Sequence, residues 1–277
     1  MRSRSTCSTT PRECEATMTA RGRSALVMMV ALACSVLTAP AQASPTDEDN
    51  ATLGSQIRKF EPLDPLPELN LDPLATVPGM DVASYQGNVD WASWYGQGKR
   101  FAYVKATESH SYTNPYFAQQ YNGSYDVGMI RGAYHFAIPN ASSGAAQANY
   151  FVDNGGGWSA DGRTLPGALD VEYNPYGQVC YDMSGDALTA WIKDFSDTYH
   201  ARTGRYPVIY TSTNWWNQCV SGTFGTTNPL WIARYADSPG ELPRGWLLWT
   251  FWQHTSDPLD QNTFNGPLSG LQALAHG

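Results

Sequence analysis

From Gly79 onward, short apolar or β-branched runs alternate with longer stretches that mix apolar and polar residues. The runs that predict strands are residues 79–83, 101–107, 130–136, 167–172, 206–212, 230–235 and 247–254. Segments between them, such as "NPYFAQQYNGSYDVG" and "DALTAWIKDFSDTYHARTG", predict helices, and "LSGLQALAHG" predicts a closing helix. Nearly continuous apolar strands that alternate with helices are typical of a parallel sheet covered by helices. We therefore predict an α/β fold, a single barrel of seven or eight such units.

The first 43 residues are expected to be an export signal. Arg21 and Arg23 precede the mostly apolar run 24–37, and Ala41-Gln42-Ala43 has the small-x-small pattern of a cleavage site. The apolar run is shorter than a comfortable membrane span. We expect translation to start at Met18, because the polar stretch before it does not resemble the beginning of a signal peptide.

Residues 44–78 differ in composition from the segment that begins at Gly79. They are acidic, rich in proline and poor in aromatic side chains, so they can bury little apolar surface. We expect them to form a disordered leader or linker. The folded part is then 79–277, which is long enough for one well-packed domain.

The charge balance excludes some classes of partner. The formal net charge is −8, and the first 43 residues contain five Arg and two Glu, so the remaining chain has a net charge of −11. Such a chain offers no basic surface for nucleic acid or an anionic membrane. We therefore expect no nucleic-acid partner, and no membrane association after the signal is removed.

The chain has five cysteines and five histidines, whose positions indicate whether it forms a disulfide, carries a lipid or binds a metal. Cys180 and Cys219 alone come after the cleavage site, and in an exported chain they most simply form one disulfide, two free thiols being the alternative. Lipidation of Cys34 is disfavoured, because Ala31 occupies the position where a lipobox normally has Leu. No histidine pair has a spacing such as H-E-x-x-H, so we expect no metal and no other cofactor.

Polar or aromatic side chains end most of the predicted strands. They are Asp81, Glu108, His135, Phe136, Asp170, Glu172, Tyr210, Trp252 and Gln253, and Asp260 comes after the last strand. In an α/β barrel, the C-terminal ends of the strands meet at one rim, where active sites are assembled from several loops. The pattern predicts such a site, although His135 could equally be a buried core histidine.

The stretch "GALDVE" places Asp170 and Glu172 one residue apart at the end of a strand. Side chains alternate along a strand, so both carboxylates face one side with Cα atoms about 6.6 Å apart. Glycoside hydrolysis uses paired carboxyl groups about 5–9 Å apart. Two carboxylates in a desolvated cleft raise at least one pKa, which keeps one of them protonated near neutral pH. Alternatively, each carboxylate caps a helix or forms an ion pair.

Asp81 would bring a third carboxylate to the same rim, unless it serves as a turn or capping residue. Asp260 is either a further site residue or the acid of an Asx-turn. Aromatic residues make up 13% of the chain, and Tyr134, Phe136, Tyr210, Trp231 and Trp252 lie at or near predicted strand ends. Carbohydrate clefts combine aromatic platforms with hydrogen-bonding groups, whereas most aromatic side chains of a domain belong to its core.

Five segments resemble the successive motifs of one enzyme family. They are "GMDVASYQGNVDW", "FAYVKATESHSYTNPYF", "IRGAYHFAIPNASSGAAQANYF", "LPGALDVEYN" and "RTGRYPVIYTSTNWW". These look like the motifs of glycoside hydrolase family 25 lysozymes of the secreted actinobacterial type, and the resemblance covers essentially all of 79–277. It implies an N-acetylmuramidase that cleaves the β-1,4 bond between N-acetylmuramic acid and N-acetylglucosamine in peptidoglycan. It also implies an irregular, flattened, TIM-like barrel with an antiparallel element near its end.

The resemblance also implies roles for individual residues. Glu172 would be the general acid and Asp170 its partner near the anomeric carbon, while Asp81 matches the family's first-strand aspartate. Asp260 matches the late aspartate of a D-x-N segment, and Cys180 and Cys219 fall where this branch has a disulfide. We expect substrate to be bound by Asp260, Glu108, Tyr134, Phe136, Tyr210, Trp231, Trp252 and Gln253. The expected protein is a secreted monomer that acts on peptidoglycan glycan strands.

Two positions depart from the family pattern. Ser109 stands where the family usually has Gly after "K-A-T-E", and Ala83 where it commonly has Ser. Neither change removes a carboxylate, so subsite preference is more affected than activity. The expected reaction proceeds with net retention, in which Asp170 either attacks directly or orients the substrate's 2-acetamido group to attack. Because both sugars carry an acetamido group, we favour the second route.

Two other functions are compatible with parts of the pattern. A catalytically inactive sugar-binding protein could keep the barrel, but binding alone does not require Asp81, Asp170 and Glu172. A chitinase-like glycosidase also has a D-x-E strand end, but its D-x-x-D-x-D-x-E run would need aspartates at the positions of Leu165 and Ala168.

Overall fold

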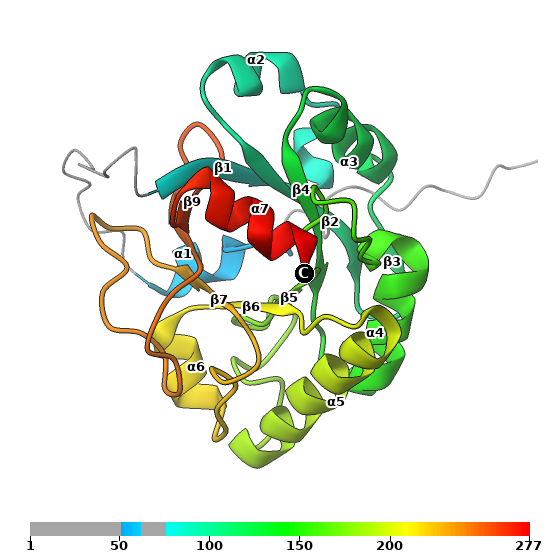
Figure 1. Cartoon of the computed structure of the whole chain (residues 1–277). Coiled ribbons are helices and arrows are strands. Elements are labelled where there is room, and N and C mark those ends of the chain that lie inside the picture. The colour runs from blue at the N-terminus through cyan, green and yellow to red at the C-terminus, as the bar shows by residue number, and fades with distance from the viewer. Residues whose placement is uncertain (1–50, 62–75) are drawn as a thin grey trace, which may run out of the picture. The chain divides into compact units, whose positions relative to one another are not determined.

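The strands of the chain close into a barrel. The computed structural model describes residues 51–61 and 76–277, and the strands are β1 Thr76–Val82, β2 Phe101–Glu108, β3 Tyr112–Thr113, β4 Ile130–Phe136, β5 Ala168–Asp170, β6 Val208–Thr211, β7 Leu230–Ala233, β8 Phe251–Thr255 and β9 Gln261–Asn265. The strand order is β1-β9-β8-β7-β6-β5-β4-β2-β3, and a further pairing of β1 with β2 closes the ring (Figure 1). The short β3 lies outside this ring.

Neighbouring strands of the ring run parallel except around β9. β9 pairs antiparallel with both β8 and β1, whereas β1, β2, β4, β5, β6, β7 and β8 pair in parallel along the chain. The expected TIM-like α/β barrel with an antiparallel element near its end is therefore confirmed.

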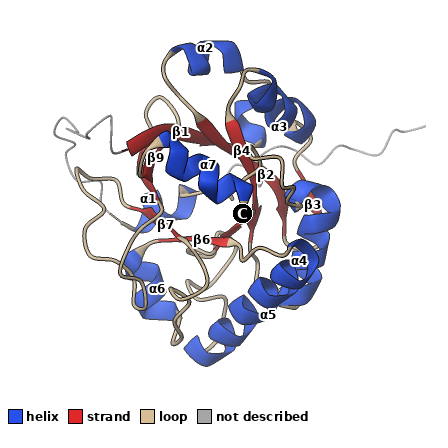
Figure 2. Ribbon diagram, viewed as in Figure 1, coloured by secondary structure: helices blue, strands red, loops and turns tan. Residues whose placement is uncertain are grey.

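The helices α2 to α6 lie around the outside of this ring (Figure 2), whereas α1 and α7 lie at its two ends. The helical elements are α1 Ser55–Phe60, the 3-10 turn η2 Ser84–Gln86, α2 Trp91–Gly96, α3 Phe117–Asp126, α4 Gly144–Phe151 with the π-helical turn η3 Val152–Gly156, α5 Gly185–Thr203, α6 Thr213–Cys219 and α7 Leu268–His276. Ser143, Ser184 and Ser212 cap α4, α5 and α6, each accepting a hydrogen bond from a backbone N–H of the first turn. α7, in red, lies across the near end of the barrel in Figure 1. The backbone of this helix contacts Trp158 and Arg205, which precede β5 and β6, so it covers the end opposite the strand C-termini.

All seven predicted strands are present, and besides the two-residue β3 the hydrophobic pattern missed β9. The sequence of β9, "QNTFN", is mostly polar, yet Gln261, Asn262, Thr263 and Phe264 are buried. The polar side chain of Asn262 is buried because it hydrogen-bonds within the barrel rather than to water. A strand that buries amides in place of apolar side chains carries no hydrophobic alternation to detect.

Aromatic side chains fill the barrel interior below the strand C-termini. The rings of Tyr103 and Trp231 lie 4.7 Å apart, and Trp231 meets Tyr210 edge-on at 5.2 Å. Phe251 packs against Phe101, Tyr103 and Trp231 at 5.2–5.9 Å. This layer is a packed core, so the barrel has no open channel at this level and polar groups above it are shielded from water.

The predicted disulfide between Cys180 and Cys219 is present. It ties the loop after β5 to the last residue of α6, across 39 residues of sequence. The loop that carries Glu172 into the site is therefore anchored on its C-terminal side.

Residues 51–61 differ from the disordered leader expected for 44–78. They form α1 and its flanks, and Ala51, Leu53 and Ile57 are fully buried. The expectation failed because it averaged composition over an acidic, proline-rich stretch, whereas the segment 51–61 contains no proline and packs its own apolar side chains. β1 also starts at Thr76, three residues before the expected boundary. The expected signal peptide in 1–43, and residues 44–50 and 62–75, lie outside the described residues.

The helices of the described ranges are all too short or too polar to cross a lipid bilayer.

Candidate active site

Three carboxylates from three places in the sequence meet at the C-terminal end of the barrel. Asp81 lies near the end of β1, Asp170 ends β5, and Glu172 comes two residues later. Each of the three is at most 1% exposed. Parallel strands bring their carboxyl ends to one rim, which is why the sequence positions of these residues predicted their proximity.

Asp81 is held by two amides. Its Oδ2 accepts hydrogen bonds from Gln253 Nε2 at 2.9 Å and from Asn262 Nδ2 at 2.6 Å. Gln253 is itself oriented, because its Oε1 accepts from Tyr210 Oη at 2.7 Å and from Tyr235 Oη at 2.5 Å. Burial, reinforced by the nearby charge of Asp260, raises the pKa of Asp81 well above its usual value, although the two amides oppose the shift.

Asp170 is buried without a hydrogen-bond partner among the described residues, on either carboxyl oxygen. Burial raises its pKa well above the usual value, and the neighbouring Glu172 adds to the shift while Lys105 opposes it. An unsatisfied buried carboxyl group is costly, so this one has a stability cost that suggests a role in binding or catalysis.

Glu172 has the opposite surroundings, because both of its oxygens are occupied. Oε1 accepts from Gly54 N at 2.6 Å, and Oε2 accepts from Gln56 N at 3.1 Å and Ile57 N at 2.9 Å. Burial raises the pKa of Glu172 to about 8, although these three N–H groups and Arg58 favour the ionised form. With residues 51–61 in place, the carboxyl group can therefore hold a proton near neutral pH, a property that a general acid needs.

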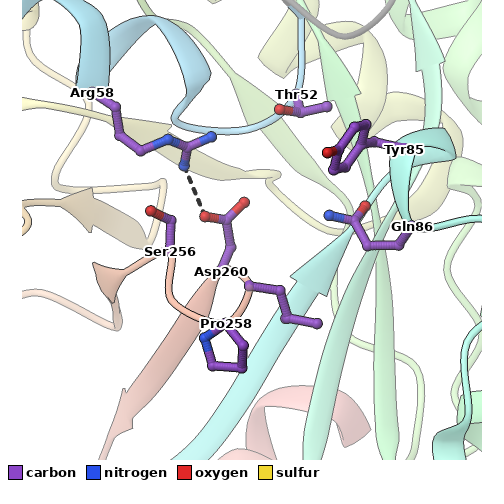
Figure 3. Close-up of a pocket in the computed structure, with 8 residues that line it drawn as sticks. Thr52, Arg58, Tyr85, Gln86, Ser256, Pro258 and Asp260 are labelled. Atoms are coloured by element: carbon purple, nitrogen blue, oxygen red, sulfur yellow. Dashed lines mark hydrogen bonds and ion pairs between the residues drawn. The ribbon is translucent and has the colours of Figure 1, made fainter.

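Asp260 directly precedes β9, where its backbone O accepts a hydrogen bond from Asp81 N, and its side chain forms an ion pair. Its Oδ1 accepts from Arg58 Nη1 at 2.7 Å, as Figure 3 shows. Burial raises the pKa of Asp260 to about 6, against the effect of Arg58. Asp260 and Arg58 line a cavity of about 290 Å³. The other residues that line it are Thr52, Tyr85, Gln86, Ser256, Pro258 and Leu259.

Glu108 ends β2 and faces the same region. It is paired with Lys105 Nζ at 2.6 Å and accepts from Tyr176 Oη at 2.6 Å. Lys105 is almost fully buried and brings a positive charge below the carboxylates. The sequence analysis did not single out Lys105, since a lysine in an apolar strand carries no signal of its surroundings.

Of the aromatic residues predicted to bind substrate, Tyr134, Phe136, Tyr210 and Trp231 lie inside the barrel, whereas Trp252 does not. Tyr134, Tyr210 and Phe136 lie on the inner side of their strands, where Tyr134 Oη accepts from Leu53 N at 3.4 Å and Phe136 lies 5.2 Å from Lys105 Nζ. Trp231 lies deeper, and its Nε1 donates to Asn262 Oδ1 at 2.9 Å, which orients the amide that holds Asp81.

Trp252 and His135 are not brought together with the carboxylates. Because Gln253 points to Asp81, the adjacent Trp252 faces away, where its ring meets Trp249 and its Nε1 donates to Arg234 O at 2.8 Å. His135 lies between Thr107 Oγ1 at 2.8 Å and Gln147 Oε1 at 2.9 Å, and burial lowers its pKa to about 3. It is therefore a neutral core histidine, one of the two alternatives that the sequence left open.

Besides Lys105, three polar residues at this rim were not among the predicted site residues. Asn262 donates a hydrogen bond to Asp81, Tyr235 orients Gln253 toward Asp81, and Arg58 pairs with Asp260. Asn262 lies two residues after Asp260 on β9, so alternation would have placed it on the inner face once that strand was known. Nothing local in the sequence distinguishes Tyr235 or Arg58 from surface residues.

The two departures from the family pattern lie near this rim. Ser109 has a φ of 52°, in the left-handed region that favours glycine, so the loop keeps a glycine conformation with a serine in it. Ala83 comes directly after β1 and is buried.

Within 51–61 and 76–277, no group of three or more His, Cys, Asp and Glu side chains is arranged to hold a metal ion.

Comparison with known proteins identifies the family. The model of the glycosyl hydrolases family 25 matches residues 80–262. The chain is 48% identical over 210 residues to lysozyme M1 of Streptomyces globisporus, covering 72% of this chain and 71% of that protein. It is 49% identical over 211 residues to an N,O-diacetylmuramidase of Chalaropsis sp, covering 73% of this chain and all of that protein.

Solved structures agree with this assignment. A muramidase from Acremonium alcalophilum is 55% identical with a TM-score of 0.72, and the match covers 73% of this chain and 99% of that chain. A bacterial lysozyme from Streptomyces coelicolor is 47% identical with a TM-score of 0.71, covering 72% of this chain and 97% of that one. A chain of about the length of residues 76–277 therefore folds by itself in these relatives. The barrel, its rim of carboxylates and these matches together show that the chain belongs to glycosyl hydrolase family 25 and is a glycoside hydrolase.

Proposed function

We propose that the protein is a lysozyme, which hydrolyses the β-1,4 bond between N-acetylmuramic acid and N-acetylglucosamine in peptidoglycan with net retention. The observation that carries the proposal is the pair at the end of β5. It combines Glu172, whose pKa burial raises to about 8, with Asp170, whose oxygens have no hydrogen-bond partner in the described chain. A proton donor beside an available carboxylate is the arrangement that retaining glycosidases need. The names of the relatives, a lysozyme and an N,O-diacetylmuramidase, support the choice of substrate.

In the proposed first step, Glu172 gives its proton to the glycosidic oxygen while the bond from the anomeric carbon to that oxygen breaks. The carbonyl oxygen of the muramic acid 2-acetamido group forms a bond to the anomeric carbon, and Asp170 accepts the acetamido N–H. N-acetylglucosamine leaves with the proton from Glu172. The free oxygens of Asp170 suit this role, because an N–H donor would satisfy a carboxylate that otherwise lacks a partner.

In the second step, Glu172 takes a proton from water, whose oxygen attacks the anomeric carbon and reopens the ring formed with the acetamido group. Asp81 lies at the same rim, and its negative charge would stabilise the positive charge that develops at the anomeric carbon. Gln253 and Asn262 fix its position, so little reorganisation is needed during the reaction. The rigid hydrogen-bond network supports this electrostatic role.

We further propose that the chain is exported as a monomer after removal of residues 1–43. The disulfide between Cys180 and Cys219 supports this, since disulfides persist in oxidising compartments outside the cytosol. The negative charge of the exported chain argues against nucleic acid as its partner.

Replacing Glu172 with Gln tests the general acid. The chain 76–277 lacks Gly54, Gln56 and Ile57, whose N–H groups bind Glu172 and cover it. In this chain we expect Glu172→Gln to lower hydrolysis of purified peptidoglycan by about 10²–10⁴-fold. Borohydride reduction of the wild-type products should yield reduced muramic acid, which identifies the cleaved bond. Asp197→Asn, an equivalent change at an exposed ion pair on α5, serves as the control and should retain full activity. Full activity of Glu172→Gln, or reduced glucosamine in place of muramic acid, would contradict the proposal. If no new reducing ends form although the chain binds peptidoglycan, the sugar-binding alternative is favoured.

A stable analogue of the acetamido intermediate tests the role of Asp170. The thiazoline derived from N-acetylmuramic acid mimics that intermediate, and we expect it to bind about 10²-fold or more tightly than the sugar itself. Asp170→Asn should weaken this inhibition more than it weakens substrate binding. Detection of a sugar covalently attached to the peptide that contains Asp170, by mass spectrometry of a quenched reaction, would show direct attack and contradict the acetamido route.

The charge of Asp81 should cost stability while it serves catalysis. Because its pKa is raised in the fold, the wild type loses stability relative to Asp81→Asn as pH rises above the ordinary aspartate value of 3.8. We expect Asp81→Asn to be as stable as the wild type near pH 3.5 and more stable at pH 7, with a higher Tm. Its activity should fall sharply. Thermal unfolding at both pH values measures this, and a variant less stable than the wild type at pH 7 would show that the charge stabilises the site.

A further inference from the structure

The segment 51–61, which precedes the family domain, occupies the site from which the reaction must proceed. We call it the leader segment. Its backbone donates three hydrogen bonds to Glu172, from Gly54, Gln56 and Ile57. A general acid must come within about 3 Å of the glycosidic oxygen. With both oxygens of Glu172 already bound to backbone N–H groups, and Asp81 and Asp170 buried, a glycan cannot make that contact.

We propose that the leader segment is a built-in inhibitor of this active site, which fills the cleft that the glycan must enter, and that the enzyme becomes active when the segment leaves. This inference rests on the proposed function, because only a polymeric substrate bound at these carboxylates would be excluded by it. The contacts of the leader segment are specific rather than incidental.

The leader segment contacts side chains of the rim along its whole length, among them Tyr134 and Asp260 of the predicted substrate-binding residues. At its start, Ala51 O accepts from Lys105 Nζ, and Leu53 N donates to Tyr134 Oη at 3.4 Å. In the middle, Arg58 Nη1 donates to both Asp260 and Tyr235 at 2.7 and 3.0 Å.

At its end, Phe60 stacks on Tyr173 with ring centroids 4.6 Å apart. Glu61 accepts from Tyr173 Oη at 3.1 Å and from Ser212 Oγ. One peptide therefore satisfies hydrogen-bonding groups and an aromatic surface that a sugar chain would otherwise use.

The shape of the contact excludes a loose fit. Gly54 has a φ of 76°, and a Cβ atom placed on it would lie 2.1 Å from Tyr235 Oη, 2.5 Å from Gln253 Oε1 and 2.7 Å from Tyr210 Oη. These are the groups that orient Gln253 toward Asp81. Only glycine allows the backbone to approach them so closely.

Two separate cavities remain at this rim, and the leader segment lines both of them. The cavity of Figure 3 is lined by Thr52 and Arg58 together with Asp260, and a second one of about 340 Å³ is lined by Ile57 and Glu61 together with Tyr235. Asp81, Asp170 and Glu172 line neither of them. A glycan strand needs one continuous groove past these carboxylates, so removal of the segment would have to join the two spaces.

Charge adds to the fit. The leader segment carries Arg58 and Lys59 against Glu61, a net positive charge, and it meets a rim of carboxylates. The family model starts at residue 80, so the leader segment lies outside the matched domain. A peptide-bond cut between Glu61 and Thr76 would turn it into a separate peptide with no covalent tie to the cleft.

The test compares peptidoglycan hydrolysis by the chain 44–277, the chain 76–277, and the chain 44–277 carrying Gly54→Val. We expect the wild-type 44–277 to be at least about tenfold slower than 76–277, and Gly54→Val to recover most of the difference, because its side chain cannot fit beside Tyr235. Gly96→Val, the same substitution at an exposed glycine that ends α2 and has open space around it, is the matched control and should stay slow.

Hydrogen exchange of the amides of Gly54, Gln56 and Ile57 reports occupation independently of catalysis. We expect protection in wild-type 44–277 and loss of protection in Gly54→Val. Equal hydrolysis rates for the two wild-type chains, or unprotected amides, would overturn the inference while leaving the lysozyme assignment intact.

If neither chain length hydrolyses peptidoglycan, the proposed function fails, and co-sedimentation with insoluble peptidoglycan then decides the inference. Stronger binding by 76–277 than by 44–277 would support occlusion of the cleft, and equal binding would overturn it.

Discussion

The burial of carboxyl groups at one end of the barrel is the constraint on which the rest of the site depends. Asp81, Asp170, Glu172 and Asp260 are all buried there, and burial is the main cause of the raised pKa of each. Taking charged carboxylates out of water is costly, so the fold must pair them, neutralise them with protons, or leave them ready for a substrate. The four residues divide among these outcomes.

Each outcome corresponds to a different chemical use. Asp81 is fixed by two amides, which suits an immobile negative charge, and Asp260 is paired with Arg58. Asp170 has no hydrogen-bond partner among the described residues, and Glu172 is bound by the backbone of the leader segment. The leader segment covers Glu172, which contributes to the burial that favours its protonated form, and it also supplies hydrogen-bond donors to both oxygens. A peptide that supplies N–H groups and a guanidinium therefore stabilises the site while it blocks it.

The sequence predicted the barrel and its carboxylates because both depend on local pattern. Apolar runs identified seven strands, and strand ends identified Asp81, Asp170 and Glu172. β9 was missed because its inward residues are amides, and Trp252 was grouped with Gln253 although adjacent strand residues face opposite sides. Arg58 and Gly54 could not be found from composition, because their roles come from contacts with residues more than 100 positions away in the sequence.

The central claim is that burial, rather than hydrogen bonding or neighbouring charge, governs the protonation of Glu172. It is tested most directly by an NMR titration of the side-chain carboxyl carbon in the chain 44–277, with the signal assigned by its absence in Glu172→Gln. Our account predicts a pKa near 8, far above the ordinary glutamate value of 4.5. A pKa at or below 4.5 would contradict it, and would mean that the three backbone N–H groups and Arg58 outweigh the loss of water.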